Sequence, residues 1–561
     1  MIRLFFALNF ILRIMMKSLG VVMISSLSWW SCGSDSETLV SEQQSRISPL
    51  LNTELKLWPV PTAVDSSSET CHMSRNFKFQ LANNSSRTPL ISEAIDRFTS
   101  DLSVLLAMSK TLNESSACES RYCDVLVEDD EIVDWFTDPV QEYYEIKFKD
   151  PAGCWISCKS VFGCMHGMKT FIQFIEPMNS NSIPSNFNVT DIPQFPHRGL
   201  LIDTSRWFLS PDVIKLHIDM MSASKLNVLH WHLVDDFGFS VSLPSFPELA
   251  SKGAISQYAI YTPATVRELI AYARARGVII MPELDIPGHS SRWFLSHPEL
   301  MGIAENGIDP TRPETYEFLK LVIADTVDLF QTNVIHLGGD ELYDAWSTAA
   351  INVWMKSNSM YSHSDLVHYW LTKMNDIATD LNITVIMWED FLPLVKAWSG
   401  QYTHIKWQMW MRSSGETAAV ALPNKVFSTD FYLDHIDKNW VHFYEKGRDF
   451  AKNANGNIAG GEACMWGEWV DDTNILQRTW PRAAAIAETL WSHPDNTQGG
   501  FGTALLRLVK WRCRMMEFFG YKFIEPLGQV TPSNPEIPMT WGTDQSQWWC
   551  PETDFARQQV R

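Results

Sequence analysis

The second half of the chain alternates between short apolar runs and longer stretches in which apolar residues recur at helical spacing. The short runs are apolar at successive positions, which is typical of strands buried on both faces of a parallel sheet. Eight runs are predicted to be such strands: LLID (200–203), NVLHWHLV (227–234), VIIMPEL (278–284), NVIHLGG (333–339), ITVIMW (383–388), HIKWQMW (404–410), KVFSTD (425–430) and NIAGGEACMW (457–466).

Helix signals separate several of these strands. Ser210-Pro211 and Thr262-Pro263 predict helix starts, because Ser and Thr cap helices and Pro fits the first turn. A third predicted helix has Leu366, Trp370, Met374, Ile377 and Leu381 along one face. Repeated β/α units predict an α/β fold with a (β/α)8 TIM barrel. The alternative, a doubly wound open sheet, lacks a Gly-rich dinucleotide fingerprint after any strand.

The first part of the chain has a different pattern. Short alternating stretches such as YYEIKFKD (143–150), followed by an apolar helical run near 161–175, predict a small α+β domain over residues 55–180. Residues 178–197 are rich in Asn and Pro and predict a boundary. The TIM-barrel catalytic domain is expected over residues 198–561.

The N-terminus predicts export. Residues 1–32 contain two apolar pieces, and neither reaches the ~20 residues that span a bilayer. With Lys17 as the basic region and 19–30 as the apolar region, the pattern favours a secretory signal, and Met15 and Met16 are alternative starts. An uncleaved signal-anchor is the alternative. Residues 33–54 are polar and Ser-rich, so we expect a linker or pro-segment.

Cysteines and sequons agree with export to the lysosome or out of the cell. Of ten cysteines, Cys32 lies at the predicted signal and Cys464 lies in a core strand, which leaves up to four disulfides in an oxidising lumen. The eight remaining cysteines are at positions 71, 118, 123, 154, 158, 164, 513 and 550. Cys154 and Cys158 also resemble half a zinc site, but no His/Cys cluster accompanies them. N-x-S/T sequons occur at Asn83, Asn84, Asn113, Asn188 and Asn382.

Charge excludes one class of partner. The chain has 45 Lys and Arg against 65 Asp and Glu, a formal net charge of −20. Nucleic-acid binding needs a basic surface, so no nucleic-acid partner is expected. An acidic protein is suited to an acidic compartment, where protonation relieves self-repulsion.

Polar and aromatic residues gather where the predicted strands end, which is where TIM barrels hold their functional groups. Carboxylates supply acid/base catalysis and accept hydroxyl hydrogen bonds, and Trp faces cover the apolar side of a sugar ring. The pattern therefore predicts carbohydrate chemistry. The residues are Asp203, Arg206, His232, Asp235, Asp236, Glu283, Asp285, His289, Asp340, Glu341, Trp388, Glu389, Trp410, Tyr432, Asp434, Trp466 and Glu468.

These segments resemble the glycoside hydrolase family 20 β-N-acetylhexosaminidases. The matching runs are RGLLIDTSRWF (198–208), NVLHWHLVDD (227–236), MPELDIPGHS (281–290), HLGGDE (336–341), WED (388–390), FYLD (431–434) and GGEACMWGEW (460–469). The resemblance implies exo-acting removal of terminal β-linked N-acetylglucosamine or N-acetylgalactosamine by a substrate-assisted retaining mechanism. It extends into YYEIKFKD and FGCMHGMKTFIQF (162–174), which look like the family's N-terminal domain.

The resemblance also implies catalytic roles. Glu341 would be the general acid and later the base, and Asp340 would stay ionised and orient the 2-acetamido group. Asp235 and His289 would form a chain that tunes the proton affinity of Glu341.

The same resemblance implies the substrate-binding residues. Tyr432 would donate to the acetamido oxygen, and Asp434 would face C6 and disfavour 6-sulfated sugars by like-charge repulsion. The remaining residues would wall the acetamido pocket (Trp388, Trp410 and Trp466) or hold the hydroxyls of the terminal sugar (Arg206 and Glu468).

Two positions depart from the family pattern. Tyr343-Asp344-Ala345-Trp346 stands where some animal relatives have a cysteine, so a loop disulfide is expected to be missing. Residue 435 is His, which leaves the preferences at the pocket rim open.

Three other functions compete with this interpretation. They are a non-catalytic sugar-binding protein, an endo-acting chitin hydrolase, and a metalloenzyme using HWH (230–232) and His289. Alternate histidines in a buried strand favour hydrogen bonding over zinc, so no metal and no organic cofactor are expected. The predicted partner is a glycan, and the resemblance also favours a homodimer.

Overall fold

The computed structural model describes residues 57–83, 85, 88–109, 116–128, 139–176, 181–342, 344–497 and 500–517. They belong to one compact unit, Asn52–Arg561. The predicted signal and linker, Asn84, Asn113 and Cys550 lie outside the described residues. Within the described ranges, no helix combines the length and apolarity needed to cross a membrane.

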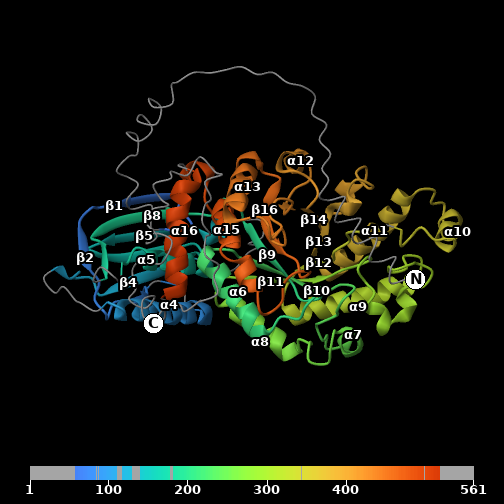
Figure 1. Ribbon diagram of the computed structural model, residues 1–561, viewed down its shortest axis with the longest axis horizontal. Coiled ribbons are helices and arrows are strands. Elements are labelled where there is room, and N and C mark those ends of the chain that lie inside the picture. Colours follow the sequence, from blue (N-terminus) through green and yellow to red (C-terminus); the bar gives the residue numbers. More distant parts are fainter. Residues whose placement is uncertain are drawn as a thin grey trace, which may run out of the picture. The chain divides into compact units, whose positions relative to one another are not determined.

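The first part of the chain forms a six-stranded sheet with the order β1-β8-β5-β6-β4-β3. Figure 1 labels four of these strands, β1, β8, β5 and β4. Alternate residues of its strands are buried; in β5 these are Tyr144, Ile146 and Phe148, and they pack against two helices. The strands are β1 (Ala63–Ser66), β3 (Lys78–Leu81), β4 (Tyr122–Val127), β5 (Tyr144–Lys149), β6 (Gly153–Cys158) and β8 (Asn186–Asp191), and the helices are α4 (Pro89–Ala107) and α5 (Val161–Gln173). β2 (Thr70–His72) and β7 (Ser182–Pro184) form a separate antiparallel pair.

The predicted boundary at 178–197 is wrong in one respect. Strands β7 and β8 lie inside it, and β8 pairs with both β1 and β5, so the first sheet continues to Asp191. The Asn-rich composition concealed an alternating strand in which Phe187, Val189 and Asp191 are buried between exposed or half-exposed neighbours.

The eight predicted barrel strands are all present and close into a parallel barrel in the order β10-β11-β12-β13-β14-β15-β16-β9. This confirms the TIM-barrel prediction. The strands are β9 (His197–Asp203), β10 (Val228–Val234), β11 (Ile279–Leu284), β12 (Val334–His336), β13 (Thr384–Trp388), β14 (Ile405–Met409), β15 (Lys425–Phe427) and β16 (Ile458–Met465).

Helices cover the outside of the barrel. They are α6 (Pro211–Ser224), α7 (Pro247–Gly253), α8 (Pro263–Arg274), α9 (Pro313–Phe330), α10 (Ala349–Ser357), α11 (His363–Leu381), α12 (Ser414–Ala419), α13 (Trp440–Asn453), α14 (Ile475–Thr479), α15 (Arg482–Trp491) and α16 (Gly500–Glu517). The three helices predicted from sequence are α6, α8 and α11. Thr262 caps α8 by accepting from the Thr265 N–H, whereas Ser210 precedes α6 without a side-chain capping bond.

Three disulfides join residues of the first part of the chain: Cys71 with Cys118, Cys123 with Cys154, and Cys158 with Cys164. Cys154 and Cys158 are therefore in separate disulfides, which contradicts the zinc alternative for that pair. Cys513 in α16 is also disulfide-bonded. Cys464 is free and buried in β16, as predicted.

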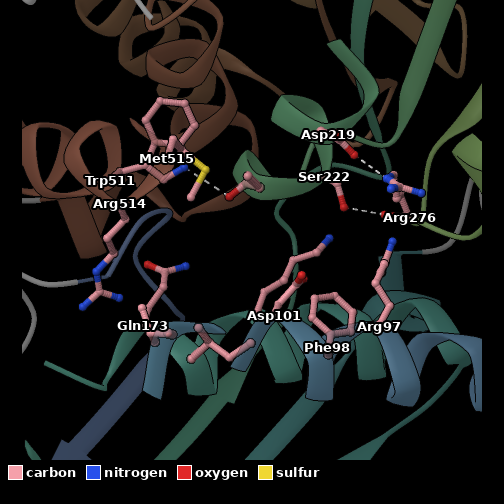
Figure 2. Close-up of a pocket in the computed structure, with 14 residues that line it drawn as sticks. Arg97, Phe98, Asp101, Gln173, Asp219, Ser222, Arg276, Trp511, Arg514 and Met515 are labelled. Carbon is pink, nitrogen blue, oxygen red and sulfur yellow. Dashed lines mark hydrogen bonds and ion pairs between the residues drawn. The ribbon is translucent and has the colours of Figure 1, made fainter. Parts of the chain in front are cut away.

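Buried charges connect the two parts of the chain. Arg198 at the start of the barrel donates to both carboxylate oxygens of Glu142, at 2.7 and 2.6 Å, and both side chains are almost fully buried. α16 makes a second connection through two side chains, Trp511 and Arg514 (Figure 2). Trp511 donates to the carbonyl of Ala223 in α6, and Arg514 donates to the carbonyl of Ile175.

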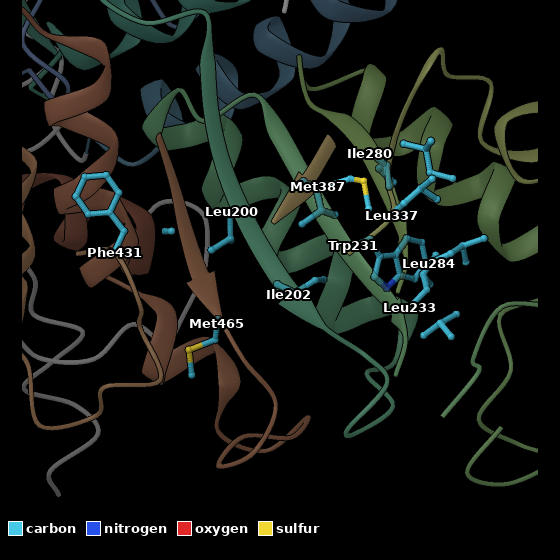
Figure 3. Packing of buried hydrophobic residues seen from close by; sticks show 14 of the residues in the cluster. Leu200, Ile202, Trp231, Leu233, Ile280, Leu284, Leu337, Met387, Phe431 and Met465 are labelled. Carbon is cyan, nitrogen blue, oxygen red and sulfur yellow. The ribbon is translucent and has the colours of Figure 1, made fainter. Parts of the chain in front are cut away.

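The barrel strands point alternate residues outward and inward. Outward residues such as Leu200, Ile202 and Trp231 form the large core between strands and helices (Figure 3). The inward residues form layers, as is usual in TIM barrels. An apolar layer (Val228, Met281, Ile386 and Val426) is followed by a polar layer (His230, Glu283, His336, Gln408 and Glu462) and then by an aromatic layer (Trp388, Trp466, Trp410 and Tyr432, with Leu201 and Cys464).

The Arg198–Glu142 pair generates a stability prediction. Burial opposes ionisation of Glu142, but Arg198 and then His166 outweigh it and lower its pKa from 4.5 to about 2. Because this pKa is depressed, its stabilisation is fully present above pH 4.5 and is lost as the pH falls towards 2. Glu142→Gln leaves a buried guanidinium without its counter-ion, so we expect the free energy of unfolding to fall by about 3–5 kcal/mol.

Urea unfolding at pH 5.5 measures this loss, and the exposed Glu93→Gln on α4 is the matched control. A Glu142→Gln protein as stable as the control would show that the pair does not hold the two parts together.

Candidate active site

The carboxyl ends of the barrel strands bring the predicted site residues together at one end of the barrel. A continuous set of contacts runs from Arg206 through Asp235 and His289 to Asp340 and Glu341. A second set of ring contacts joins Trp388, Trp466, Tyr432 and Trp410. The charge of Asp434 acts on both Tyr432 and Glu468.

A glycine turn after β12 presents the two acidic residues. Gly338 and Gly339 have φ of 59° and 92°, a left-handed conformation that favours glycine. A side chain at Gly338 would overlap the Asp285 carboxylate, which accepts from the Gly339 N–H at 3.1 Å. The HLGGDE motif therefore has two functions. Its two glycines allow the backbone to turn, and its two acidic residues provide the carboxylates. Glu341 itself has φ 50°, the kind of local strain that occurs at functional sites.

His289 lies between the carboxylates. Its Nδ1 is 3.4 Å from Asp235 Oδ1, and its Nε2 is 3.8 Å from both Asp340 Oδ2 and Glu341 Oε2. Burial opposes the charged imidazolium, but Asp235 and its neighbours outweigh burial and raise the pKa of His289 well above 6.5. The raised pKa favours the imidazolium form of His289, which can donate towards Asp340 and Glu341.

Arg206 joins three acidic groups at the other side of the site. It lies 3.0 Å from Asp203, 2.8 Å from Asp235 and 4.0 Å from Glu468, and its guanidinium carbon is 5.1 Å from the centre of the Trp466 ring. Burial raises the pKa of Asp235, but Arg206 and then His289 reverse that effect and lower it well below 3.8. Asp235 therefore stays ionised.

The surroundings of Asp340 shift its ionisation in the ligand-free protein. Burial raises its pKa, His289 lowers it, and Asp390, Glu283 and Glu341 raise it again, so that it lies at about 7. One imidazolium does not balance three nearby carboxyls, and among the protein groups alone Asp340 is protonated at acidic pH. Within the described chain, no donor reaches the buried Asp340 Oδ1.

The aromatic residues form a wall beside these acids. Trp388 and Trp466 are buried with ring centres 5.8 Å apart, and Tyr432 lies 6.4 Å from Trp466 and 6.3 Å from Trp410. Burial raises the pKa of Tyr432 well above 10, so its hydroxyl keeps its proton and can donate.

Comparison with known proteins decides the family. Residues 195–494 match the model of the glycosyl hydrolase family 20 catalytic domain, and residues 57–174 match a "beta-acetyl hexosaminidase like" model. The chain belongs to glycosyl hydrolase family 20.

Individual relatives agree with this assignment. The chain is 34% identical to the beta-hexosaminidase subunit beta of Felis catus over 486 residues, which cover 82% of this chain and 91% of the relative. It is 31% identical to beta-hexosaminidase 3 of Arabidopsis thaliana over 482 residues, covering 82% and 89% of the two chains. Among solved structures, the chitobiase of Flavobacterium johnsoniae matches with a TM-score of 0.70 and 26% identity, covering 83% of this chain and 73% of that chain.

This family 20 member is therefore a β-N-acetylhexosaminidase, a retaining glycosidase that releases terminal N-acetylhexosamine in an exo-acting manner. The exo activity displaces the endo-acting and the non-catalytic alternatives.

Two acidic residues of the site were not given a role from sequence. Asp390 accepts the Glu341 backbone N–H at 3.2 Å and the Trp410 indole N–H at 2.7 Å, and Asp203 accepts the Gly467 N–H at 3.0 Å while pairing with Arg206. Both lie at strand ends, and Asp390 is the last residue of the WED run. This position already identified Asp203 as a candidate in the sequence, and the same signal could have identified Asp390.

The loop after Glu341 is held without a cysteine over its described residues. Trp346 is buried, donates to the Ile308 carbonyl at 2.8 Å and packs 5.5 Å from Trp370. The Trp346 indole therefore holds this loop in place. It is the loop for which the sequence predicts that the disulfide of some animal relatives is missing.

Four groups of acidic and histidine side chains come close enough to hold a metal ion within the described ranges. One group is His230, Glu283 and His336. His230 Nδ1 already lies 2.6 Å from Glu462 Oε1, and His336 Nδ1 lies 2.9 Å from Glu283 Oε1. These contacts agree with the predicted hydrogen-bonded histidines.

Asp390 generates a prediction about positioning. Asn cannot accept through both side-chain atoms, so Asp390→Asn should release either the Glu341 backbone or the Trp410 ring. Since a displacement of about 1 Å can cost roughly 100-fold in rate, we expect kcat/KM for an aryl N-acetylhexosaminide to fall by about 10–100-fold.

Steady-state kinetics measure the effect, and Asp344→Asn, in the loop that follows Glu341, is the exposed control. Unchanged kinetics in a folded Asp390→Asn protein would exclude this positioning role.

Proposed function

We propose that Glu341 is the general acid and base of the reaction and that Asp340 binds and orients the acetamido group of the substrate. The observation that carries this proposal is the arrangement around His289. Its Nε2 is equidistant from the two carboxyls, with one buried Asp340 oxygen left without a protein donor and Glu341 27% exposed.

The chemistry follows from this arrangement. The substrate N–H donates to Asp340, and the acetamido oxygen attacks the anomeric carbon while Glu341 protonates the departing glycosidic oxygen. The C–O bond to the leaving group breaks, and a cyclic oxazolinium forms whose positive charge is stabilised by ionised Asp340. Glu341 then removes a proton from water, which opens the ring and restores the β configuration.

Neighbouring residues assist these steps. Tyr432 donates its hydroxyl to the acetamido oxygen, and Trp388, Trp410 and Trp466 exclude water from the acetamido side. Arg206 and Glu468, 4.0 Å apart, bind hydroxyls of the terminal sugar and close the pocket beyond it. Asp434 faces C6, where like-charge repulsion disfavours a 6-sulfate.

The chain is further proposed to act in the secretory pathway, either in lysosomes or outside the cell, as a homodimer. Three disulfides in the described residues support an oxidising compartment. The sequon residues Asn83, Asn188 and Asn382 are exposed, as glycan attachment requires. The relatives named as subunits support assembly with a second copy.

The acid role of Glu341 predicts a dependence on the leaving group. A nitrophenolate departs without protonation, whereas a sugar alkoxide must be protonated as it leaves. Glu341→Gln should therefore reduce kcat on chitobiose by about 10²–10⁴-fold, and it should reduce kcat on a nitrophenyl glycoside by less. Both gluco and galacto epimers are assayed near pH 5, and exposed Glu317→Gln on α9 is the control. Equal losses on good and poor leaving groups would contradict acid catalysis by Glu341.

The raised pKa of Asp340 predicts how ligand affinity depends on pH. An N–H donor binds the ionised carboxylate, so ligand binding below pH 7 must release a proton. The affinity for N-acetylglucosamine should therefore be constant above pH 7 and should fall roughly tenfold per pH unit below it. Calorimetry from pH 5 to 8 measures this, and Asp340→Asn should abolish the slope. The same slope in wild type and variant would assign the titration to another group.

A further inference from the structure

A cavity lies away from the active site, where the first part of the chain packs on the barrel (Figure 2). It has a volume of about 180 Å³ and is lined by side chains of α4, α5, α6 and α16 and by Arg276. A water molecule needs roughly 10–15 Å³ of such volume, so the cavity has room for a small organic molecule.

Topology places this cavity at the opposite end of the barrel from the acidic residues. Asp219, Ser222 and Ala223 lie in the last turns of α6, which leads into β10, and Arg276 lies between α8 and β11. These positions precede the N-terminal ends of the strands, whereas the active site follows their C-terminal ends. An occupant of this cavity would therefore not contact the glycan.

The cavity contains more cations than carboxylates. Arg97, Lys169, Arg276 and Arg514 line it together with only two acids, Asp101 and Asp219. Asp219 is already engaged, because it pairs with Arg276 and accepts from the Tyr272 hydroxyl at 2.9 and 3.0 Å. Arg514 donates to the Ile175 carbonyl at 3.0 Å.

Arg97 and Lys169 are the two other cations that line the cavity. In the described part of the chain, no acceptor reaches the buried Nζ of Lys169 or the buried Nε and one buried Nη of Arg97. Both cations lie near the Phe98 ring, at 5.9 Å for Lys169 and 4.5 Å for Arg97. Buried cations without hydrogen-bond partners are unfavourable, so a binding partner for them would stabilise the protein.

The pKa shifts of Lys169 and Arg97 also indicate that burial is unfavourable for their charged forms. Burial, and then the neighbouring Arg97, lower the pKa of Lys169 well below 10.5, and burial lowers the pKa of Arg97 to about 10. Burial also raises the pKa of Asp101, and Arg97 and Arg276 act in the opposite direction. A bound anion would reverse the unfavourable environment of both cations.

The rest of the lining is mostly apolar and contains two polar side chains, Gln173 and Ser222. The apolar residues are Phe98, Leu105, Ile172, Ala223, Trp511 and Met515. A simple inorganic ion would leave this surface without a partner, whereas a small molecule with an anionic head and an apolar body would satisfy both halves.

We propose that this cavity binds an amphipathic organic anion, with its carboxylate or sulfate head between Lys169 and Arg97 and its short alkyl or aryl body against Phe98 and Trp511. Because α4 and α5 belong to the first part of the chain and α6 to the barrel, the bound anion joins the two parts. Its effect is on stability and not on the glycosidic step.

The test uses three probes on the full-length protein: sodium octanoate, which has both head and body, sodium acetate, which has only the head, and 1-octanol, which has only the body. Calorimetry gives each affinity, and thermal unfolding gives the stabilisation. At 100 times its Kd, octanoate should raise the thermal midpoint by about 2–3 °C. Acetate and octanol should bind at least tenfold more weakly.

Two variants locate the site. Lys169→Met keeps the aliphatic length and removes the charge, so octanoate affinity should fall at least tenfold while the midpoint of the ligand-free protein rises. A lysine with a purely structural role would give a lower midpoint instead. Arg97→Leu provides an independent second variant, and exposed Lys356→Met on α10 is the control.

Octanoate binding that is unchanged in Lys169→Met and in Arg97→Leu would overturn the proposal. Equal binding of acetate and octanoate would overturn the amphipathic class, because the apolar lining would then contribute nothing. Glycosidase activity is not the readout, so these outcomes are independent of the roles proposed for Asp340 and Glu341.

Discussion

Glu283 is a carboxylate buried inside the barrel, and its surroundings determine how the strands and the site above them are arranged. Its oxygens lie 3.0 Å from His230, 2.5 Å from His232 and 2.9 Å from His336, and the Trp388 indole donates to it at 3.0 Å. Burial opposes its charge, but these histidines outweigh burial and lower the pKa of Glu283 well below 4.5. A buried carboxylate is tolerated only when it is paired in this way.

The same layer extends around the barrel. His230 also contacts Glu462 of β16, and Glu462 accepts from Gln408 of β14 at 2.8 Å. His197 of β9 lies 3.0 Å from Glu462. Contacts from this layer thus join seven of the eight strands, which resists a shift of register between them. Trp388 and His232 connect this layer to the site, because both contact Glu283 and His232 also lies 3.2 Å from Asp235. The positions of the groups that we propose for catalysis therefore depend on charges buried deeper in the barrel.

Much of this could be predicted from sequence, for reasons that differ between residues. The strands were predictable because apolar runs report burial, and the strand-end acids were predictable because parallel strands bring their carboxyl ends together. The raised pKa of Asp340 could not be predicted, because it depends on Asp390, Glu283 and His289, which are distant in sequence. β8 was missed because composition concealed its alternation, and the cationic cavity was missed because Arg97 and Lys169 meet only through packing.

The distribution of cysteines determines which part of the fold is sensitive to thiol reduction. The three disulfides described in the first part of the chain close loops of 47, 31 and 6 residues, whereas the barrel core holds one buried thiol, Cys464. Cross-links of this kind act mainly by restricting the unfolded chain. Thiol reduction would therefore loosen the small sheet first, and Arg198, whose counter-ion Glu142 lies beside that sheet, would lose its partner. Redox conditions outside the barrel thus reach the barrel through the buried ion pairs that join it to the small sheet, Arg198–Glu142 and Lys225–Asp191.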